Sequence, residues 1–198
     1  WSGRRLMLNF GAVDWEATVW LNGVRVGEHR GGFTPFSLDV TRALAPQGEQ
    51  EIVVRVWDPS DTGTQPRGKQ VLEPQGIWYT PVTGIWQTVW AEPVGETAIA
   101  RLRLTPDLAG RRLRLDAVLD GHPGGLTLLA SARDGGSTVA DVSGPAGATL
   151  DVPVASPKLW TPDTPSLYDL RLELVRDGRV VDTVDSYFAM REIALGRD

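Results

Sequence analysis

The pair Asn22-Gly23 is the feature that most restricts how this chain can fold. It stands between two runs rich in apolar and β-branched residues, 17–21 and 24–27. Asn-Gly readily adopts the positive φ angles that a two-residue type I′ turn requires. Residues alternate along 17–21 so that one face can enter a core while the other meets solvent. The sequence therefore predicts a β-hairpin here.

Alternating apolar residues predict further strands on both sides of this hairpin. They are expected at 6–10, 36–39, 52–57 and 84–91, and a brief helical turn is expected at 41–44. The second half shows the same period of two, with candidate strands at 101–105, 112–119, 126–130, 148–154, 170–174 and 180–187. Asp177-Gly178 predicts another two-residue hairpin turn. About seven short strands in about 100 residues is typical of an immunoglobulin-like sandwich.

Composition favours two soluble domains. The chain has 198 residues, of which 41% are hydrophobic, enough for two cores, and Pro93-Val94-Gly95 suggests a boundary between domains 1–94 and 95–198. The net charge is −5, and no basic block marks a nucleic-acid surface. No apolar run approaches the roughly 20 residues that span a membrane. The first residue is Trp1 rather than Met, so we expect an excised piece, and both cytoplasmic and secreted locations stay open.

Few residues could carry catalysis by themselves. Cysteine is absent, which excludes disulfides and thiol chemistry. His29 and His122 are isolated, so neither a metal site nor a catalytic triad is indicated. Nothing brings two carboxylates together, and we expect no catalytic residue, metal or cofactor in this chain. Gly31-Gly32 has no phosphate-binding pattern around it, and flexible entry to Phe33 accounts for it.

The long stretch 58–83 lacks any strand or helix pattern. It exceeds the roughly 12–15 residues at which structureless connections become uncommon, so we expect it to be functional or disordered. Its hydrogen-bonding groups and its aromatic platform are Asp58, Asp61, Arg67, Lys69, Gln70, Glu73 and Trp78.

Several motifs together resemble glycoside hydrolase family 2, which includes β-galactosidases, β-glucuronidases and β-mannosidases. The order 8–14, the Asn-Gly hairpin and Gly-Gly-Phe-Thr-Pro-Phe at 31–36 look like the sugar-binding sandwich that precedes the family's catalytic barrel. Leu159–Tyr168 looks like the Trp-x-Pro-x-x-Pro-x-Leu-Tyr segment of its immunoglobulin-like domain, with Trp160 and Tyr168 expected in the core. Residues 187–192 resemble the exit strand, although Ala189 stands where the family usually has Gly.

The resemblance implies an all-β chain: a partial jelly-roll, galactose-binding-like domain followed by an immunoglobulin-like sandwich. The family's two catalytic glutamates come from the barrel, which this chain lacks. The resemblance therefore implies a non-catalytic, β-galactosidase-like fragment that buttresses the barrel and shapes the sugar entrance. In some members a loop of this sandwich contributes polar groups to the sugar subsite, so the resemblance makes the seven residues named in 58–83 candidate substrate-binding residues. The alternative is a loop that packs against the barrel. Its expected partners are the barrel, a carbohydrate substrate and a possible second copy. Strands missing before Trp1 would leave exposed sheet edges.

Two other readings stay open, a stand-alone carbohydrate-binding module and a structural or adhesive pair of sandwiches. Trp86 and Trp90 would form the sugar platform of such a module, whereas in this family they are expected to pack in the sandwich or in a seam between domains. Some β-galactosidases carry a sugar-contacting Asp just before the Trp of this region. Here Gly76-Ile77 precedes Trp78, so that contact cannot be transferred.

Overall fold

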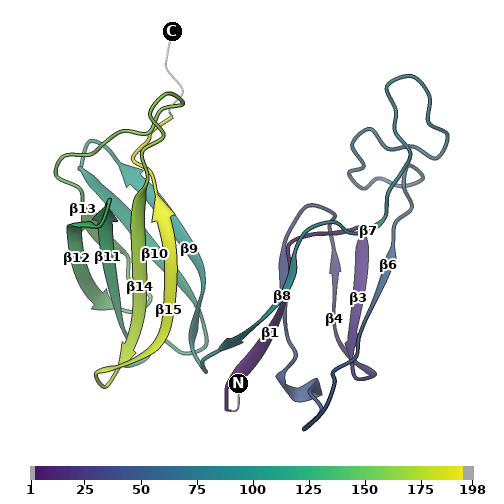
Figure 1. Ribbon diagram of the computed structural model, residues 1–198, viewed down its shortest axis with the longest axis horizontal. Helices are drawn as coiled ribbons and strands as arrows, with labels where there is room; N and C mark the ends of the chain where they lie inside the picture. Colours follow the sequence, from purple (N-terminus) through teal and green to yellow (C-terminus); the bar gives the residue numbers. More distant parts are fainter. Residues whose placement is uncertain (1–2, 194–198) are drawn as a thin grey trace. The chain divides into compact units, whose positions relative to one another are not determined.

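The computed structural model describes residues 3–193 and is almost entirely β-structure. The chain forms two compact units, 1–94 and 95–198, which are considered one at a time (Figure 1). No helix in the described part of the chain is long and apolar enough to cross a membrane. The helical turn expected at 41–44 is present as the 3₁₀ turn Thr41–Ala43.

The first unit contains two three-stranded antiparallel sheets and a short two-stranded ladder. The sheets have the orders β5-β1-β8 and β4-β3-β6, and β2 pairs with β7. The strands are β1 (Arg5–Phe10), β2 (Val13–Asp14), β3 (Glu16–Leu21), β4 (Val24–Arg30), β5 (Phe36–Asp39), β6 (Ile52–Trp57), β7 (Gly84–Ile85) and β8 (Val89–Val94).

The core of the first unit comes from alternate residues of these strands. Leu6, Leu8 and Phe10 of β1 face Ala17, Val19 and Leu21 of β3, and all six side chains are buried. The ring of Phe10 stacks on Phe36 with 4.7 Å between centroids. Each large apolar side chain removed from water in this way contributes roughly 1.5–3 kcal/mol to folding.

The predicted hairpin is confirmed. Asn22 and Gly23 have φ angles of 50° and 78°, both in the left-handed region, and they join β3 to β4. The Asn22 side chain also joins three parts of the chain: its Nδ2 donates to the carbonyl of Ala43 and to Gln50, and its Oδ1 accepts from the Glu51 backbone N–H. Asn at this position therefore serves both the turn and the connection that follows β5.

The single strand expected at 84–91 was wrong in one respect, because the chain leaves the ladder between β7 and β8. The backbone N–H of Trp86 donates to Ala12 at 3.3 Å, and that of Gly11 donates to Thr88 at 2.8 Å. The two paired segments, 5–14 and 84–94, are therefore interrupted opposite each other. At this point 84–94 changes from pairing with β2 to pairing with β1. The strand then continues through Pro93, which an edge strand tolerates.

The two larger sheets of the first unit end in β4, β5, β6 and β8, and two of these edge strands, β6 and β8, carry exposed tryptophans. Within residues 3–193 no further strand pairs with the outer edge of β6 or of β8. Trp57 on β6 and Trp90 on β8 are 51% and 44% exposed. Trp90 therefore does not fill the sandwich, contrary to one of the two packing roles expected for it.

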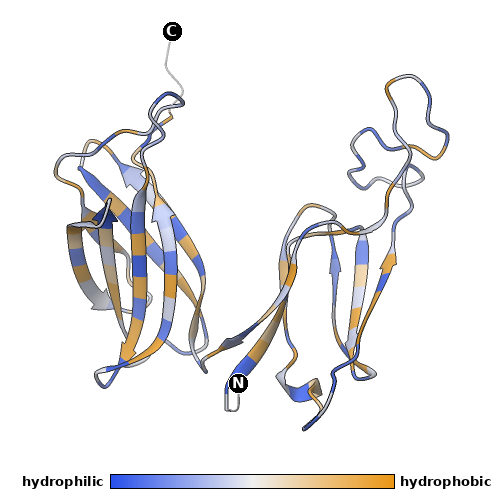
Figure 2. Cartoon of the chain, viewed as in Figure 1, coloured by the Kyte–Doolittle hydropathy of each residue, from blue (hydrophilic) through white to orange (hydrophobic). Residues whose placement is uncertain are grey.

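The second unit is a seven-stranded sandwich of two antiparallel sheets, with orders β13-β10-β9 and β12-β11-β14-β15. Figure 2 shows hydrophobic and hydrophilic residues alternating along these strands. The inward residues form one core that includes Leu113, Leu128 and Leu172. The strands are β9 (Ala98–Asp107), β10 (Arg112–Asp120), β11 (Thr127–Asp134), β12 (Ser137–Pro145), β13 (Leu150–Pro153), β14 (Tyr168–Arg176) and β15 (Arg179–Phe188).

The proline-rich segment 159–168 connects strands irregularly, as predicted, but its two aromatic residues differ. Tyr168 is buried, stacks on Phe188 and accepts a hydrogen bond from the Lys158 backbone N–H at 2.7 Å. Trp160 is only partly buried, and the centre of its ring lies 4.5 Å from the guanidinium carbon of Arg191. The prediction of a core Trp160 was therefore wrong.

We expect Asn22→Ala to destabilise the first unit by about 1–3 kcal/mol, because alanine tolerates the left-handed conformation poorly and all three side-chain hydrogen bonds are lost. Seven of the eight tryptophans lie in residues 1–94, so tryptophan fluorescence during urea unfolding reports this unit. Asn22→Asp keeps the turn preference and one acceptor, and should have a smaller effect. Equal stability of Asn22→Ala and wild type would contradict this role.

Candidate functional site

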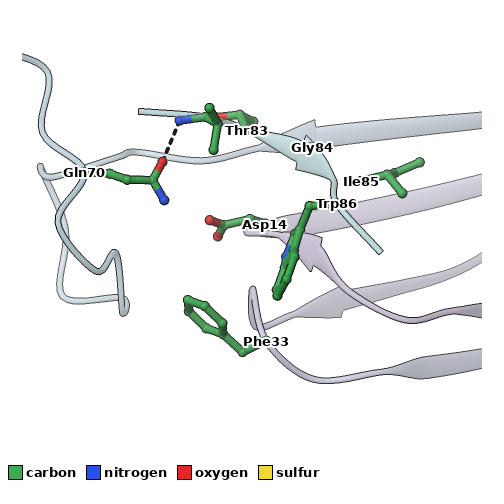
Figure 3. Close-up of a pocket in the computed structure, with 8 residues that line it drawn as sticks. Asp14, Phe33, Gln70, Thr83, Gly84, Ile85 and Trp86 are labelled. Atoms are coloured by element: carbon green, nitrogen blue, oxygen red, sulfur yellow. Dashed lines mark hydrogen bonds between the residues drawn. The ribbon is translucent and has the colours of Figure 1, made fainter. Parts of the chain in front are cut away.

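The strongest candidate site is a cavity of about 340 Å³ in the first unit, at the ladder between β2 and β7. Figure 3 shows the carboxyl group of Asp14 facing the space between Gln70 and the rings of Phe33 and Trp86. These side chains come from β2, the turn after β4, the long loop and the end of β7. The complete lining is Asp14, Phe33, Gln70, Val82, Thr83, Gly84, Ile85 and Trp86.

Backbone contacts bring these separate segments together. In the β2–β7 ladder Asp14 lies opposite Gly84. The indole Nε1 of Trp86 donates to the Gly32 carbonyl at 2.7 Å and so ties the end of β7 to the turn that carries Phe33. A Cβ at position 32 would collide with the Asp14 carboxyl group. Close approach, rather than flexible entry to Phe33, is therefore the reason for glycine at position 32.

Asp14 is the unusual group of this cavity. Its side chain belongs to a residue that is only 8% exposed, and its Oδ1 is buried without a hydrogen-bond partner. Burial raises the pKa of Asp14 above its ordinary value of 3.8, and the negative charge of Asp58 raises it further. An unpaired buried carboxylate is costly, so this arrangement favours an occupant that donates hydrogen bonds or brings positive charge.

Asp58 does not make a second reactive carboxyl group for the cavity. Its Oδ1 accepts from the Ser60 backbone N–H at 2.8 Å, and its Oδ2 accepts from the Thr83 hydroxyl at 3.1 Å. Retaining glycosidases need two carboxyl groups that both face the sugar. In the described residues no group of three or more His, Cys, Asp or Glu side chains could hold a metal ion. Asp14 is therefore the only carboxyl group among the residues that line the cavity.

The loop 58–83 extends beyond the strands of its own unit (Figure 1). The structure divides its predicted binding residues among three places. Gln70 reaches the Asp14 cavity, where its side-chain oxygen accepts from the Val82 backbone N–H at 2.6 Å. Asp61, Glu73 and Trp78 line a separate, open hollow of about 540 Å³. Asp58, Arg67 and Lys69 line neither.

The remaining contacts of the loop are mostly structural. Arg67 donates to the backbone carbonyl of Asp61 at 2.9 Å, and its guanidinium lies 5.9 Å from the ring centre of Trp78. The Lys69 carbonyl accepts from the Tyr79 backbone N–H at 2.8 Å. These bonds hold the two halves of the loop together and position Trp78, which is 40% exposed, beside the open hollow.

Sequence reasoning missed Asp14, Phe33 and Trp86 as members of one site. Asp14 and Phe33 were noticed only as letters of family-like motifs, and Trp86 was expected to pack in the sandwich or in a seam between domains. Trp86 is 51% exposed, so it does not fill the sandwich. One signal was available: an acidic residue directly after the apolar pair Ala12-Val13, between two predicted strands. The pairing of 13–14 with 84–85, some 70 residues away, has no local signature.

The raised pKa of Asp14 predicts a pH-dependent stability of the first unit. Because the folded pKa exceeds the unfolded value, Asp14 is best accommodated when protonated, and its contribution to stability is lost as the pH rises from about 4 through the folded pKa. Asp14→Asn should remove this loss, so the variant should gain stability relative to wild type as the pH rises. Urea titrations followed by tryptophan fluorescence from pH 4 to pH 7 measure the difference, with Asp61→Asn as the charge-matched control. A constant difference between Asp14→Asn and wild type across this range would contradict the assignment.

Comparison with known families matches two models of one family to successive parts of the chain. Residues 1–82 match the glycosyl hydrolase 2 galactose-binding domain-like model, and residues 97–191 match the model of glycosyl hydrolases family 2. A β-glucuronidase of Paenibacillus borealis is 28% identical over 98% of this chain. A β-galactosidase large subunit of Leuconostoc lactis is 28% identical over 99% of it.

The chain spans only about a third of the length of these relatives, 34% of the former and 31% of the latter. Solved structures with the same fold include a putative β-galactosidase from Bacteroides fragilis, with a TM-score of 0.78 at 23% identity, covering 98% of this chain and 31% of that one. A β-glucuronidase from Ruminococcus gnavus also has a TM-score of 0.78, at 22% identity, covering 98% of this chain and 34% of that one. With both of its sandwiches matched in order, the chain belongs to glycosyl hydrolase family 2.

Proposed function

We propose that this chain is the non-catalytic, sandwich-forming part of a β-galactosidase-like family 2 enzyme, where it supports the catalytic barrel and shapes the entrance for the sugar. The domains in this proposal are 1–94 and 95–198. The relatives that it matches are named as β-galactosidases and β-glucuronidases and are about three times as long. In this reading the acid and the nucleophile lie in polypeptide beyond the chain.

The observation that carries the proposal is the open hollow of the long loop. Asp61, Glu73 and Trp78 combine two carboxylate acceptors with an indole that is 40% exposed, which together suit the hydroxyls and the apolar face of a pyranose. The hollow is open, so it offers one wall rather than an enclosed site. A one-sided wall supports a role in shaping an entrance that another domain completes.

We expect the chain alone neither to hydrolyse nor to bind the glycoside substrates measurably. Aryl β-galactosides and β-glucuronides should not be turned over above the buffer rate, because in this proposal the catalytic acid and the nucleophile lie outside the chain. Calorimetric titration with the methyl glycosides should show no saturable heat. Robust turnover abolished by one Asp or Glu substitution would overturn the proposal, and saturable binding lost in Trp78→Ala would favour a stand-alone carbohydrate-binding module.

In the longer enzyme that contains this chain, Trp78→Ala should lower kcat/KM by about tenfold, the equivalent of about 1.4 kcal/mol, through loss of the aromatic wall. Trp90→Ala is the matched control, since Trp90 is similarly exposed, at 44%, but lies on β8 outside the hollow. Steady-state kinetics on both variants make the comparison. Unchanged kcat/KM in Trp78→Ala would favour a purely structural pair of sandwiches.

A further inference from the structure

The Asp14 cavity differs in chemistry from the open hollow and is not explained by sugar entry. It contains the carboxyl group of Asp14, one oxygen of which is buried without a partner, and two aromatic rings line the same cavity. Of the residues that line it, Asp14 is the only acidic one, and none is basic. The nearby Asp58 adds negative charge, and Thr83 and Ser60 already use its two oxygens as acceptors. The cavity is therefore negative without a cation of its own.

The aromatic walls are arranged so that a flat cation could lie against them. The rings of Phe33 and Trp86 meet edge to face, with 5.9 Å between centroids and an interplanar angle of 71°. They are 57% and 51% exposed, so both keep free surface. The indole N–H of Trp86 is already bonded to Gly32, which orients the ring and leaves its π-face as the means of contact. Cations bind favourably over such faces, and guanidinium groups also stack on them.

The chain's own nearby arginine does not supply this cation. Arg67 is the arginine of the long loop, and its guanidinium is engaged with the Asp61 carbonyl and the ring of Trp78. Gln70 contributes a carboxamide whose oxygen is taken by Val82. The cavity thus has the carboxyl group and the two aromatic rings of an ion-pair site, but none of the described residues that line it supplies the cation.

We propose that this cavity is a socket for the guanidinium group of an arginine carried by polypeptide outside this chain. A guanidinium fork matches a carboxylate with two parallel hydrogen bonds while its plane lies on an aromatic ring. It would neutralise Asp14 beside Asp58, which a neutral occupant cannot do. The inference rests on the proposed function only in where the arginine comes from: the relatives are about three times as long as this chain.

A sugar is the alternative occupant, because its hydroxyls could donate to Asp14 and accept from the free amide of Gln70. The two occupants can be distinguished experimentally, because the guanidinium group is charged and the sugar is neutral. Propylguanidinium is the probe for the proposed socket, propylurea is its neutral counterpart of the same shape, and methyl β-D-galactopyranoside represents the sugar. All three can be titrated into the chain at pH 7 and constant ionic strength.

The readout is the indole ¹⁵N–H resonance of Trp86, assigned by its disappearance in Trp86→Phe. Propylguanidinium should shift it saturably, and Asp14→Asn should weaken the apparent affinity at least about tenfold. Asp61→Asn, with the same loss of charge in the neighbouring hollow, should titrate like wild type. Propylurea and the galactoside should give no saturable shift at the same concentrations.

Two results would overturn the socket. One is equal affinity of propylguanidinium for wild type and Asp14→Asn, and the other is a saturable shift by the galactoside but not by propylguanidinium. If Asp14→Asn loses the dispersed indole spectrum of a folded chain, Phe33→Leu serves instead, since it keeps Asp14, removes one ring and should weaken binding several-fold. The kinetic test of Trp78→Ala has a different readout, so failure of the socket leaves the proposed function standing, and the reverse also holds.

Discussion

The first unit depends on the antiparallel pairing of its beginning with its end. Strand β1 and the short β2 pair with β8 and β7, which join residues 5–14 to 84–94 across the whole unit. Closing so long a loop costs conformational entropy, and the ladder is stabilised only because its inward side chains, such as Leu8 and Phe10, are buried at the same time. The matched interruption in both strands then turns the chain so that Asp14 lies at the edge of the core.

This pairing also holds the carboxyl group of Asp14 in an electrostatically unfavourable position. Asp14 is held by backbone pairing on a two-residue strand, directly after two fully buried apolar residues. Its buried oxygen has no partner, and Asp58 adds a second negative charge nearby. Buried polar groups without partners are uncommon in folded domains and often mark places where something else binds. The two exposed aromatic rings that line the same cavity also favour a binding site.

Local patterns sufficed for much of the fold. Asn22-Gly23 and Asp177-Gly178 both form the predicted two-residue turns, because each pair tolerates positive φ angles. Strand β12 was missed, although Gly135-Gly136 marks the turn before it, since Ser137–Pro145 has few large apolar residues to reveal its alternation. Trp160 was misplaced because a pattern cannot distinguish a ring buried in the core from a ring covered by an arginine.

The sequence by itself determined the all-β class, the two hairpin turns, the family and the extent of the long loop, because turn preference, two-residue alternation and motif order are properties of neighbouring residues. Only the tertiary structure decided which residues meet. It separated Gln70 from Asp61, Glu73 and Trp78, which share its loop, and it joined Asp14, Phe33 and Trp86 from three distant segments. The physical reason is that strand register and long-range pairing depend on how whole sheets bury their apolar faces, and no local stretch of sequence encodes that balance.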